Sequence, residues 1–369
     1  MHRLVALDLP GGPDFVDALR RAWDDGDAVL PVDQRFPPAA KAALIAAMGA
    51  SRVVEPTGAT ELTEGRPVES GDALVVATSG STGTPKGVVL THGAIAASAD
   101  ATSTHLAVDP SADHWLACLP LSHVGGLSVV TRALQTGTPL TVLPGFDADL
   151  VDASEATLVS LVATAMRRID TARWRVIVLG GAHAPADRPV NSVTTYGMTE
   201  TGSGVVYDGR PLDHVEIAIV DGEVRLRCPM LLRCYRDGTD PFLPGGWFPT
   251  GDLGELTDDG RLVVHGRRGD LIITGGENVW PDPVERILAR HPRIADVGVA
   301  GVPDPEWGHL VTAFVVPTDD HPPTLDELRD LVRAELPAYC APRDVVIVPR
   351  LPRTTLGKLK RGLLAPGRE

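Results

Sequence analysis

The most constraining feature of the chain is a short apolar run that leads directly into a glycine-rich loop. Leu74–Ala77 has the length and composition of a buried strand, and the loop Ala77-Thr-Ser-Gly-Ser-Thr-Gly-Thr-Pro-Lys-Gly87 follows it without a break. Glycines let such a loop bend tightly and present backbone N–H groups, and Lys86 adds a positive charge suited to a polyphosphate. The loop differs from the Walker A pattern, since Pro85 precedes the lysine and Gly87 follows it. Composition alone would also allow a solvated surface loop.

Strands and helices alternate through most of the chain, which indicates a large layered α/β domain. Between about residues 215 and 264 the pattern changes to short strands separated by Asp-Gly turns, which indicates a β-rich subdomain. A small α+β unit follows a glycine-flanked break at 266–270. The spacing of apolar residues predicts helices at 14–24, 37–49, 92–106, 283–290 and 325–336, and strands at 74–77, 115–119, 175–179, 192–195, 295–302, 310–316 and 344–348.

Composition argues against several classes of protein. The formal net charge of −14 argues against a nucleic-acid surface, because such surfaces depend on lysine and arginine. No run approaches the ~18 apolar residues of a transmembrane helix, and the start of the chain lacks the long apolar region of a signal peptide. The four cysteines, Cys118, Cys228, Cys234 and Cys340, have no metal-ligand spacing. We therefore expect a cytoplasmic protein with reduced thiols, no membrane span and no nucleic-acid partner.

Three further segments contain side chains suited to nucleotide chemistry. Tyr196-Gly-Met-Thr-Glu200 combines a ring that can stack on a base, a hydroxyl, and a carboxylate that can hold a hard cation. Asp252, within Gly246-Trp-Phe-Pro-Thr-Gly-Asp-Leu-Gly254, suits hydrogen bonds to ribose hydroxyls. Pro352–Arg361 carries two of the four lysines of the chain, among them Lys358. Taken one at a time, these segments could also be turns or a solvated basic tail.

Taken together and in order, these segments resemble the adenylate-forming superfamily of acyl-CoA synthetases, adenylation domains and luciferases. The resemblance covers its phosphate loop at 77–87, its aromatic-Gly-x-Thr-Glu motif at 196–200, its Gly-Trp-Phe-x-Thr-Gly-Asp phrase at 246–252 and its lysine motif at 352–361. Three shorter segments also look like family segments: Pro120-Leu-Ser-His123, Gly180-Gly-Ala182 and Gly275-Gly-Glu-Asn-Val279. The phosphate loop and the lysine motif are individually the most distinctive.

The resemblance implies a site for ATP, Mg2+ and CoA, with roles for particular residues. It places Tyr196 on the adenine, Thr199 on the α-phosphate and Glu200 on Mg2+. It makes Lys358 the catalytic lysine and places His123 at the border of the acyl pocket. The other cofactor-binding residues that it implies are Thr78, Ser79, Gly80, Ser81, Thr82, Gly83 and Lys86 in the phosphate loop, Gly181, Ala182, Gly197 and Met198 near the adenine, Asp252 and Arg267 at the nucleotide, and Gly275 and Gly276 at the CoA tunnel.

Two domains and two half-reactions follow from the same resemblance. An N-terminal domain at residues 1–266 would bind ATP and a carboxylic acid, and a small C-terminal domain at 272–369 would supply Lys358. ATP and the acid would form an acyl-adenylate and pyrophosphate. A rotation about a hinge at 267–271 would then let CoA displace AMP.

The chain departs from the family pattern at the hinge and in the β-rich segment. The hinge position that is usually Asp or Lys is Gly269, so the usual side chain is missing at this position. Two glycines of the family pattern are replaced in the phrases Cys228-Pro229 and Cys234-Tyr235. Loss of glycine constrains φ, so we expect the local turns to differ.

The short region before the phosphate loop resembles that of compact actinobacterial o-succinylbenzoate–CoA ligases of menaquinone biosynthesis, as do His123–Leu127 and Val206–Asp213. The implied acid, o-succinylbenzoate, has a second carboxylate that needs a donor when buried. The Ser203 hydroxyl and the Gly204 N–H are the candidates. Another aryl- or acyl-CoA ligase, a stand-alone adenylation domain that loads a carrier protein, and a non-catalytic nucleotide-binding module remain alternatives. The oligomeric state is open, with a homodimer among the alternatives.

Overall fold

The computed structural model describes residues 2–78, 85–181, 187–353 and 359–364. Contacts divide the chain into two compact units. The first unit takes residues 1–217, 226–249 and 258–262, and the second takes 218–225, 250–257 and 263–369. The expected domains and the hinge at 267–271 stay predictions, because a division by contacts does not show which residues move.

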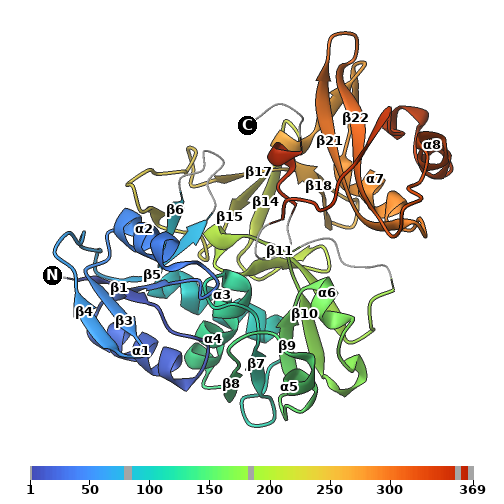
Figure 1. Cartoon of the computed structure of the whole chain (residues 1–369). Helices are drawn as coiled ribbons and strands as arrows, with labels where there is room; N and C mark the ends of the chain where they lie inside the picture. The colour runs from blue at the N-terminus through green and yellow to red at the C-terminus, as the bar shows by residue number, and fades with distance from the viewer. Residues whose placement is uncertain (1, 79–84, 182–186, 354–358, 365–369) are drawn as a thin grey trace. The chain divides into compact units, whose positions relative to one another are not determined.

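Two seven-stranded sheets form the frame of the first unit (Figure 1). Two central strands of the first sheet, β1 and β2, are buried on both faces, which explains their continuous apolar sequence. The first sheet has the strand order β16 (Cys234–Tyr235), β6 (Lys86–Thr91), β5 (Asp72–Thr78), β2 (Ala28–Pro31), β1 (Leu4–Leu7), β3 (Arg52–Glu55) and β4 (Gly58–Glu61). The second has the order β13 (Arg210–Pro211), β12 (Gly204–Tyr207), β11 (Ser192–Gly197), β10 (Val176–Leu179), β9 (Leu158–Leu161), β7 (Trp115–Ala117) and β8 (Leu140–Val142).

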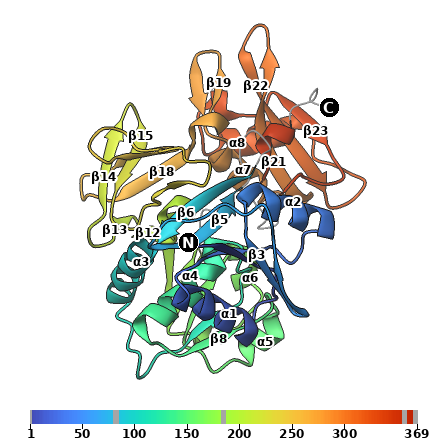
Figure 2. The same cartoon turned by 90° about the vertical axis from the view of Figure 1, so that its left-hand side faces the viewer.

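Two helices, α3 (His92–His105) and α4 (Val124–Thr136), lie side by side against these sheets (Figure 1 and Figure 2). The first of them, α3, contacts β6 of one sheet and β12 of the other, and begins where the Thr91 hydroxyl accepts a hydrogen bond from the Ala94 N–H. The second, α4, contacts β7, β8 and β9. The other helical elements of this unit are α1 (Pro13–Asp24), α2 (Pro38–Met48), α5 (Ala148–Asp152), α6 (Ala163–Met166) and the short 3-10 turns η1 (Thr171–Arg173) and η2 (Thr199–Thr201).

A four-stranded sheet has the order β14 (Glu216–Val220), β15 (Glu223–Arg227), β17 (Phe248–Leu256) and β18 (Leu262–Arg267). The turns predicted from the Asp-Gly pairs are present, with φ values of 77°, 90° and 78° at Gly222, Gly238 and Gly260. Neither Cys228 nor Cys234 has a positive φ in the described backbone. The loss of glycine at these two positions therefore brings no backbone strain.

The remaining elements all belong to the second unit. They are η3 (Arg268–Asp270), β19 (Ile272–Thr274), β20 (Glu277–Val279), α7 (Pro281–Leu288), β21 (Ile294–Asp304), β22 (Gly308–Pro317), α8 (Leu325–Arg333), η4 (Ala338–Cys340), β23 (Asp344–Ile347) and η5 (Arg361–Leu363). Five strands form one sheet in the order β20-β19-β22-β21, with β23 also paired to β22. The core lies between this sheet and the apolar faces of α7 and α8, where Val284, Leu288, Leu328 and Val332 are fully buried.

Most of the predicted elements are found within a few residues of their expected bounds. The sequence patterns did not predict α4, the N-terminal strands β1 to β4, or several other strands of the first unit, among them β6, β8, β9 and β12. None of the described helices is both long enough and apolar enough to span a bilayer.

Candidate functional site

The two ends of the phosphate loop are held by paired strands. Thr78 at the end of β5 lies opposite Lys86 at the start of β6 in an antiparallel ladder, and the Thr78 hydroxyl donates to the Lys86 carbonyl at 3.3 Å. The expected phosphate-binding residues Ser79, Gly80, Ser81, Thr82 and Gly83 lie outside the described residues, so their contacts stay predictions.

The motif at 196–200 is a strand end followed by a tight 3-10 turn. A Cβ at Gly197 would lie 2.2 Å from the Ser203 carbonyl oxygen, so only glycine fits there. The buried Thr201 hydroxyl accepts a hydrogen bond from the Met198 N–H at 2.9 Å and also lies 2.7 Å from the Ser203 carbonyl. This buried hydroxyl fixes the turn that presents the half-buried side chains of Thr199 and Glu200.

The first unit brings the loop lysine and the motif carboxylate to one residue, Tyr235. The Tyr235 hydroxyl donates to Oε1 of Glu200 at 3.0 Å, and the Lys86 ammonium lies 5.0 Å from the centre of the Tyr235 ring. The sequence analysis noted Tyr235 only as the neighbour of a replaced glycine. No strand was predicted at Tyr235, and its pairing with β6 appears only in the structure.

The carboxylate of Glu200 fits the demands of Mg2+ bound together with a nucleotide. Mg2+ in such sites takes one or two carboxylates and completes its shell with phosphate oxygens and water. Within the described residues no group of three His, Cys, Asp or Glu side chains could form an all-protein cage, so a single carboxylate with nucleotide phosphates is the arrangement the residues suit.

His123 directly precedes α4 and lies in a polar corner. Its Nε2 is 3.3 Å from an Arg35 guanidinium nitrogen and 3.6 Å from an oxygen of Asp33. Burial lowers the pKa of His123, and the Asp33 carboxylate only partly opposes this. Burial alone would raise the pKa of Asp33, but hydrogen bonds from Arg35 lower it. The imidazole is therefore neutral near pH 7.

The site also contains a buried cation that the sequence analysis missed. Arg132 on α4 is 2% exposed, and its Nη2 donates to the Ser203 hydroxyl at 3.1 Å. Its guanidinium lies 4.9 Å from the centre of the Trp115 ring. Among the described residues, nothing accepts a hydrogen bond from Nε or Nη1 of Arg132 or from the indole nitrogen of Trp115. Burial without a carboxylate partner lowers the pKa of the guanidinium.

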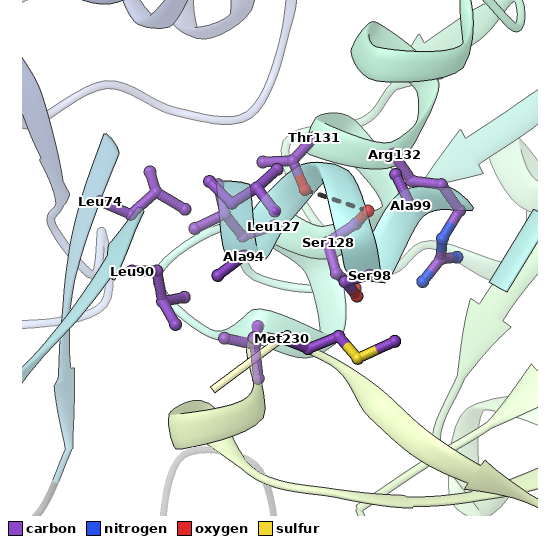
Figure 3. A pocket seen from close by; sticks show the side chains of 13 residues that line it. Leu74, Leu90, Ala94, Ser98, Ala99, Leu127, Ser128, Thr131, Arg132 and Met230 are labelled. Carbon is purple, nitrogen blue, oxygen red and sulfur yellow. Dashed lines mark hydrogen bonds between the residues drawn. The ribbon is translucent and has the colours of Figure 1, made fainter. Parts of the chain in front are cut away.

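Arg132 also lines a narrow pocket between α3 and α4 (Figure 3). Leu74 and Leu90 lie toward one end of this pocket in the view of Figure 3 and Arg132 toward the other. Most of its wall is apolar, with the hydroxyls of Ser98, Ser128 and Thr131 and the backbone of Gly202 as its polar groups. Of the described residues that line this pocket, only Arg132 carries a charge.

The second unit contains the candidate ribose site. Asp252 on β17 is 6% exposed, and its Oδ1 lies 2.7 Å from Nε of Arg267 at the end of β18. A second nitrogen of Arg267 donates to the Thr250 carbonyl at 3.1 Å, and the Thr250 hydroxyl accepts from the Asp252 N–H at 3.0 Å. The two residues expected at the nucleotide are therefore directly paired, and the aspartate is oriented by its own turn.

The turn expected at the CoA tunnel lies between β19 and β20. Gly275 and Gly276 have φ values of 59° and 84°. Glycine adopts such positive φ values with little strain, whereas other residues rarely do. A Cβ at Gly275 would lie 2.8 Å from the Trp307 ring, and the Arg343 guanidinium lies 3.5 Å from the centre of that ring. Trp307 and Arg343 were not singled out from the sequence.

Two of the remaining expected residues, Ala182 and Lys358, lie outside the described residues. Gly181, which follows β10, has a φ of 89°. Tyr196 lies on β11, which pairs in parallel with β10, so Gly181 follows the strand that is adjacent to the strand of Tyr196.

The described residues on either side of Lys358 are held firmly to the second unit. The Arg353 guanidinium pairs with Asp296 at 2.6 Å, and the backbone of Arg353 is bridged to that of Leu359. Arg361 lies 2.8 Å from Glu285 and also pairs with Asp270 and Asp282.

Comparison with known proteins agrees with this geometry. The chain matches the profile of the AMP-binding enzyme family at residues 58–229 and that of the AMP-binding enzyme C-terminal domain at residues 283–358. A Mycobacterium tuberculosis protein described as a probable 2-succinylbenzoate–CoA ligase is 38% identical over 330 residues, which cover 81% of this chain and 85% of that protein.

Solved structures give the same result. The o-succinylbenzoate CoA synthetase (MenE) of Bacillus subtilis, in complex with the acyl-adenylate intermediate OSB-AMP, has a TM-score of 0.88 and 28% identity and covers 100% of this chain and 89% of its own. The same enzyme in complex with ATP and a magnesium ion has a TM-score of 0.86 and 28% identity and covers 98% of this chain and 89% of its own. The chain therefore belongs to the family of AMP-binding, adenylate-forming enzymes that its ordered motifs indicate.

Proposed function

We propose that this chain is an acid–CoA ligase that converts o-succinylbenzoate to o-succinylbenzoyl-CoA in menaquinone biosynthesis. ATP and the acid form an acyl-adenylate and release pyrophosphate, and the CoA thiol then displaces AMP. Two comparisons support this reaction. The relatives are described as 2-succinylbenzoate–CoA ligases, and one structural neighbour holds OSB-AMP. Adenylation is needed because a free carboxylate is a poor electrophile, whereas an acyl-adenylate has a good leaving group.

The proposed roles of the residues follow from the charge that each step develops. Lys86 and the phosphate loop offset the charge of the polyphosphate, and Thr199 binds the α-phosphate. Mg2+ held by Glu200 would neutralise further phosphate charge. Asp252 and Arg267 bind the ribose side of the nucleotide, and Tyr196 stacks on its base. Lys358 stabilises the transition state of adenylation.

The observation that carries the choice of acid is the buried guanidinium of Arg132. A buried cation without a charged partner is costly, and so is the second carboxylate of o-succinylbenzoate when it enters an apolar pocket. An ion pair between the guanidinium and this carboxylate would offset the desolvation penalty of both groups. We therefore assign the second carboxylate to Arg132, with the Ser203 hydroxyl beside it at 3.1 Å. Ser203 thus contributes together with a charged donor that the sequence did not reveal.

A matched pair of acids tests this assignment. Benzoylpropionate lacks only the ring carboxylate of o-succinylbenzoate, so both acids present the same reacting group. We expect pyrophosphate release from ATP to favour o-succinylbenzoate by about 10- to 100-fold in kcat/KM, the value of one hydrogen-bonded charge. Arg132→Met should remove this preference, and Arg20→Met, at an exposed arginine on α1, should leave it unchanged. Equal turnover of both acids, or better turnover of a fatty acid, by the unaltered protein would refute the choice of acid.

The thiol acceptor and the role of Lys358 are tested in the same assay. We expect CoA to raise AMP formation and to yield a thioester, whereas a carrier-protein loading domain would stop at the acyl-adenylate. Lys358→Ala should abolish adenylation and spare thioester formation from preformed acyl-adenylate. Lys360→Ala removes a neighbouring exposed lysine and is the matched control. Equal damage to both half-reactions by Lys358→Ala would contradict the role of Lys358.

Cytoplasmic localisation and a homodimer are also part of the proposal. All four cysteines are free thiols, as in proteins of reducing compartments. Burial raises the pKa of Cys118 to about 12 and that of Cys228 to about 11, so neither is a reactive thiolate. Light scattering of the purified chain measures the oligomeric state directly.

A further inference from the structure

Tyr235 lies between a cation and an anion that do not pair with one another. Its hydroxyl donates to Glu200 at 3.0 Å, and the face of its ring lies 5.0 Å from the Lys86 ammonium. Within the described part of the chain, no ion pair joins Lys86 to Glu200. Tyr235, a neutral residue, therefore contacts both charged groups.

The backbone around Tyr235 is tied to both of the segments that carry these charges. Tyr235 on β16 lies opposite Val88 on β6, and the Arg236 N–H donates to the Gly87 carbonyl at 2.7 Å, next to Lys86. On the other side, the Leu232 N–H donates to the Glu200 carbonyl at 2.7 Å. Residues 232–236 thus tie the start of β6, which carries Lys86, to the motif glutamate.

The Arg236 side chain also ties this segment to the rest of the first unit. Its guanidinium donates to four backbone carbonyls, those of Met48, Gly49, Arg66 and Pro67. Burial lowers the pKa of Arg236, and the nearby Arg66 lowers it further. The guanidinium satisfies carbonyls at the end of α2 and in the segment between β4 and β5, and these bonds hold residues 232–236 in place.

The chemistry of a phenol suits the separation of these charges. A phenolic O–H can orient a carboxylate through one oxygen and leave the other free, and the face of the ring attracts an ammonium without neutralising it. A direct ion pair between Lys86 and Glu200 would occupy both groups and leave neither for metal or phosphate. A phenylalanine would hold only the cation, and an aliphatic residue neither.

We propose that Tyr235 is a positioning residue for the metal–nucleotide complex: it keeps Lys86 and Glu200 apart and oriented, so that the carboxylate is available to Mg2+ and the ammonium to the phosphates. This inference rests on the proposed function, because it assumes that the chain binds ATP with Mg2+. It concerns a residue to which no role is given by the family motifs considered above.

The test is equilibrium binding of ATP by calorimetry, with and without Mg2+, without any acid or CoA. In Tyr235→Phe only the hydroxyl is lost, so we expect the gain in ATP affinity caused by Mg2+ to fall by about tenfold, while metal-free ATP binding is unchanged. In Tyr235→Leu the ring is lost as well, so metal-free binding should also weaken by a few-fold. Tyr339→Phe removes a hydroxyl from a surface tyrosine of the second unit and should change neither quantity.

The outcomes separate a positioning role from a packing role. Equal losses with and without Mg2+, or no loss in either Tyr235 variant, would overturn the inference while ATP binding by the unaltered protein supports the proposed function. Absence of ATP binding by the unaltered protein would overturn both. Thermal melting of each variant shows whether it is folded, and the conservative Tyr235→Phe change keeps the test decisive if Tyr235→Leu does not fold.

Discussion

Each of the two units contains an arginine whose side chain is largely shielded from solvent, and the two arginines have opposite surroundings. Among the described residues, the guanidinium of Arg132 in the first unit donates one hydrogen bond, to a serine hydroxyl, and contacts the face of a tryptophan. Arg361 in the second unit has a side chain that is 12% exposed and pairs with Asp270, Asp282 and Glu285. It also donates to the Val299 carbonyl at 3.3 Å.

The difference indicates what each cation is for. A buried cation that is surrounded by carboxylates contributes to the fold, because removal of either side leaves uncompensated charge. A buried cation with unused donors costs stability in the free protein, and such groups are concentrated at functional sites. We therefore interpret Arg361 as a structural anchor for the segment that carries Lys358, and Arg132 as a binding group for an anion.

The largest effect is expected from Arg361→Met. This change leaves three carboxylates close together without their cation, and we expect the free energy of unfolding to fall by about 2–3 kcal/mol. The loss is smaller than the ~3–5 kcal/mol of a fully buried pair, because the Asp270 and Asp282 side chains are 30% and 32% exposed. Hydrogen exchange of β21 and β22 with mass spectrometry measures it within the second unit. Arg361→Lys should restore part of the loss, and an unchanged stability would mean that Arg361 is not an anchor.

Arg132→Met is expected to act with the opposite sign on stability. It removes an unpaired buried charge and replaces it with an apolar side chain of similar length, which is neutral or stabilising in most cases. Loss of the contact with Trp115 works against this, so we expect a free energy of unfolding unchanged or raised by about 1 kcal/mol. Urea denaturation without ligand measures it. Destabilisation as large as that of Arg361→Met would make Arg132 a structural cation and remove the support for a second carboxylate at this place.

The comparison also shows what the sequence could and could not predict. The order of the motifs predicted the family and the cofactors, because each of those motifs is local in sequence, and the roles of the site residues stay predictions. Arg132 was missed because its importance comes from burial, and burial depends on the helix α4, which was not predicted. Gly125 and Gly126 near its start reduce helix propensity, yet a Cβ at Gly126 would lie 2.3 Å from the Leu119 carbonyl oxygen, so packing requires glycine there.

Tyr235 was missed for a related reason. Its two contacts join segments that are far apart in sequence, since Glu200 is 35 residues away. The strand that carries Tyr235 has only two residues and no apolar periodicity. No pattern within the sequence could therefore predict its pairing with β6.

A further effect is expected from pH, through the Glu285 carboxylate beside Arg361. Burial raises the pKa of Glu285 to about 7 from its ordinary value of 4.5, although Arg361 opposes the shift. The folded protein therefore binds a proton that the unfolded chain has released, and the associated stability is complete below pH 4.5 and is lost as the pH rises through 7. Hydrogen exchange of β21 at pH 5 and pH 8 should show this decrease, and Glu285→Gln should reduce it. The opposite result would be a stability that rises from pH 5 to pH 8 in the unaltered protein but not in Glu285→Gln. That result would mean that folding lowers the pKa of Glu285 instead of raising it.

The smallest effect on stability is expected from Arg353→Met, which breaks a more solvent-exposed ion pair of the second unit. Arg353 and Asp296 lie 2.6 Å apart, but their side chains are 36% and 38% exposed. Solvent screens such pairs, and each contributes about 0.2–1 kcal/mol. Arg353 lies nearly as close in sequence to Lys358 as Arg361 does, so the two variants differ mainly in burial and in the number of carboxylates. The contrary result would be that Arg353→Met destabilises the second unit as strongly as Arg361→Met. Closeness to the lysine segment, and not burial of the charge, would then determine the loss of stability. The contrast drawn between Arg132 and Arg361 would lose its physical basis.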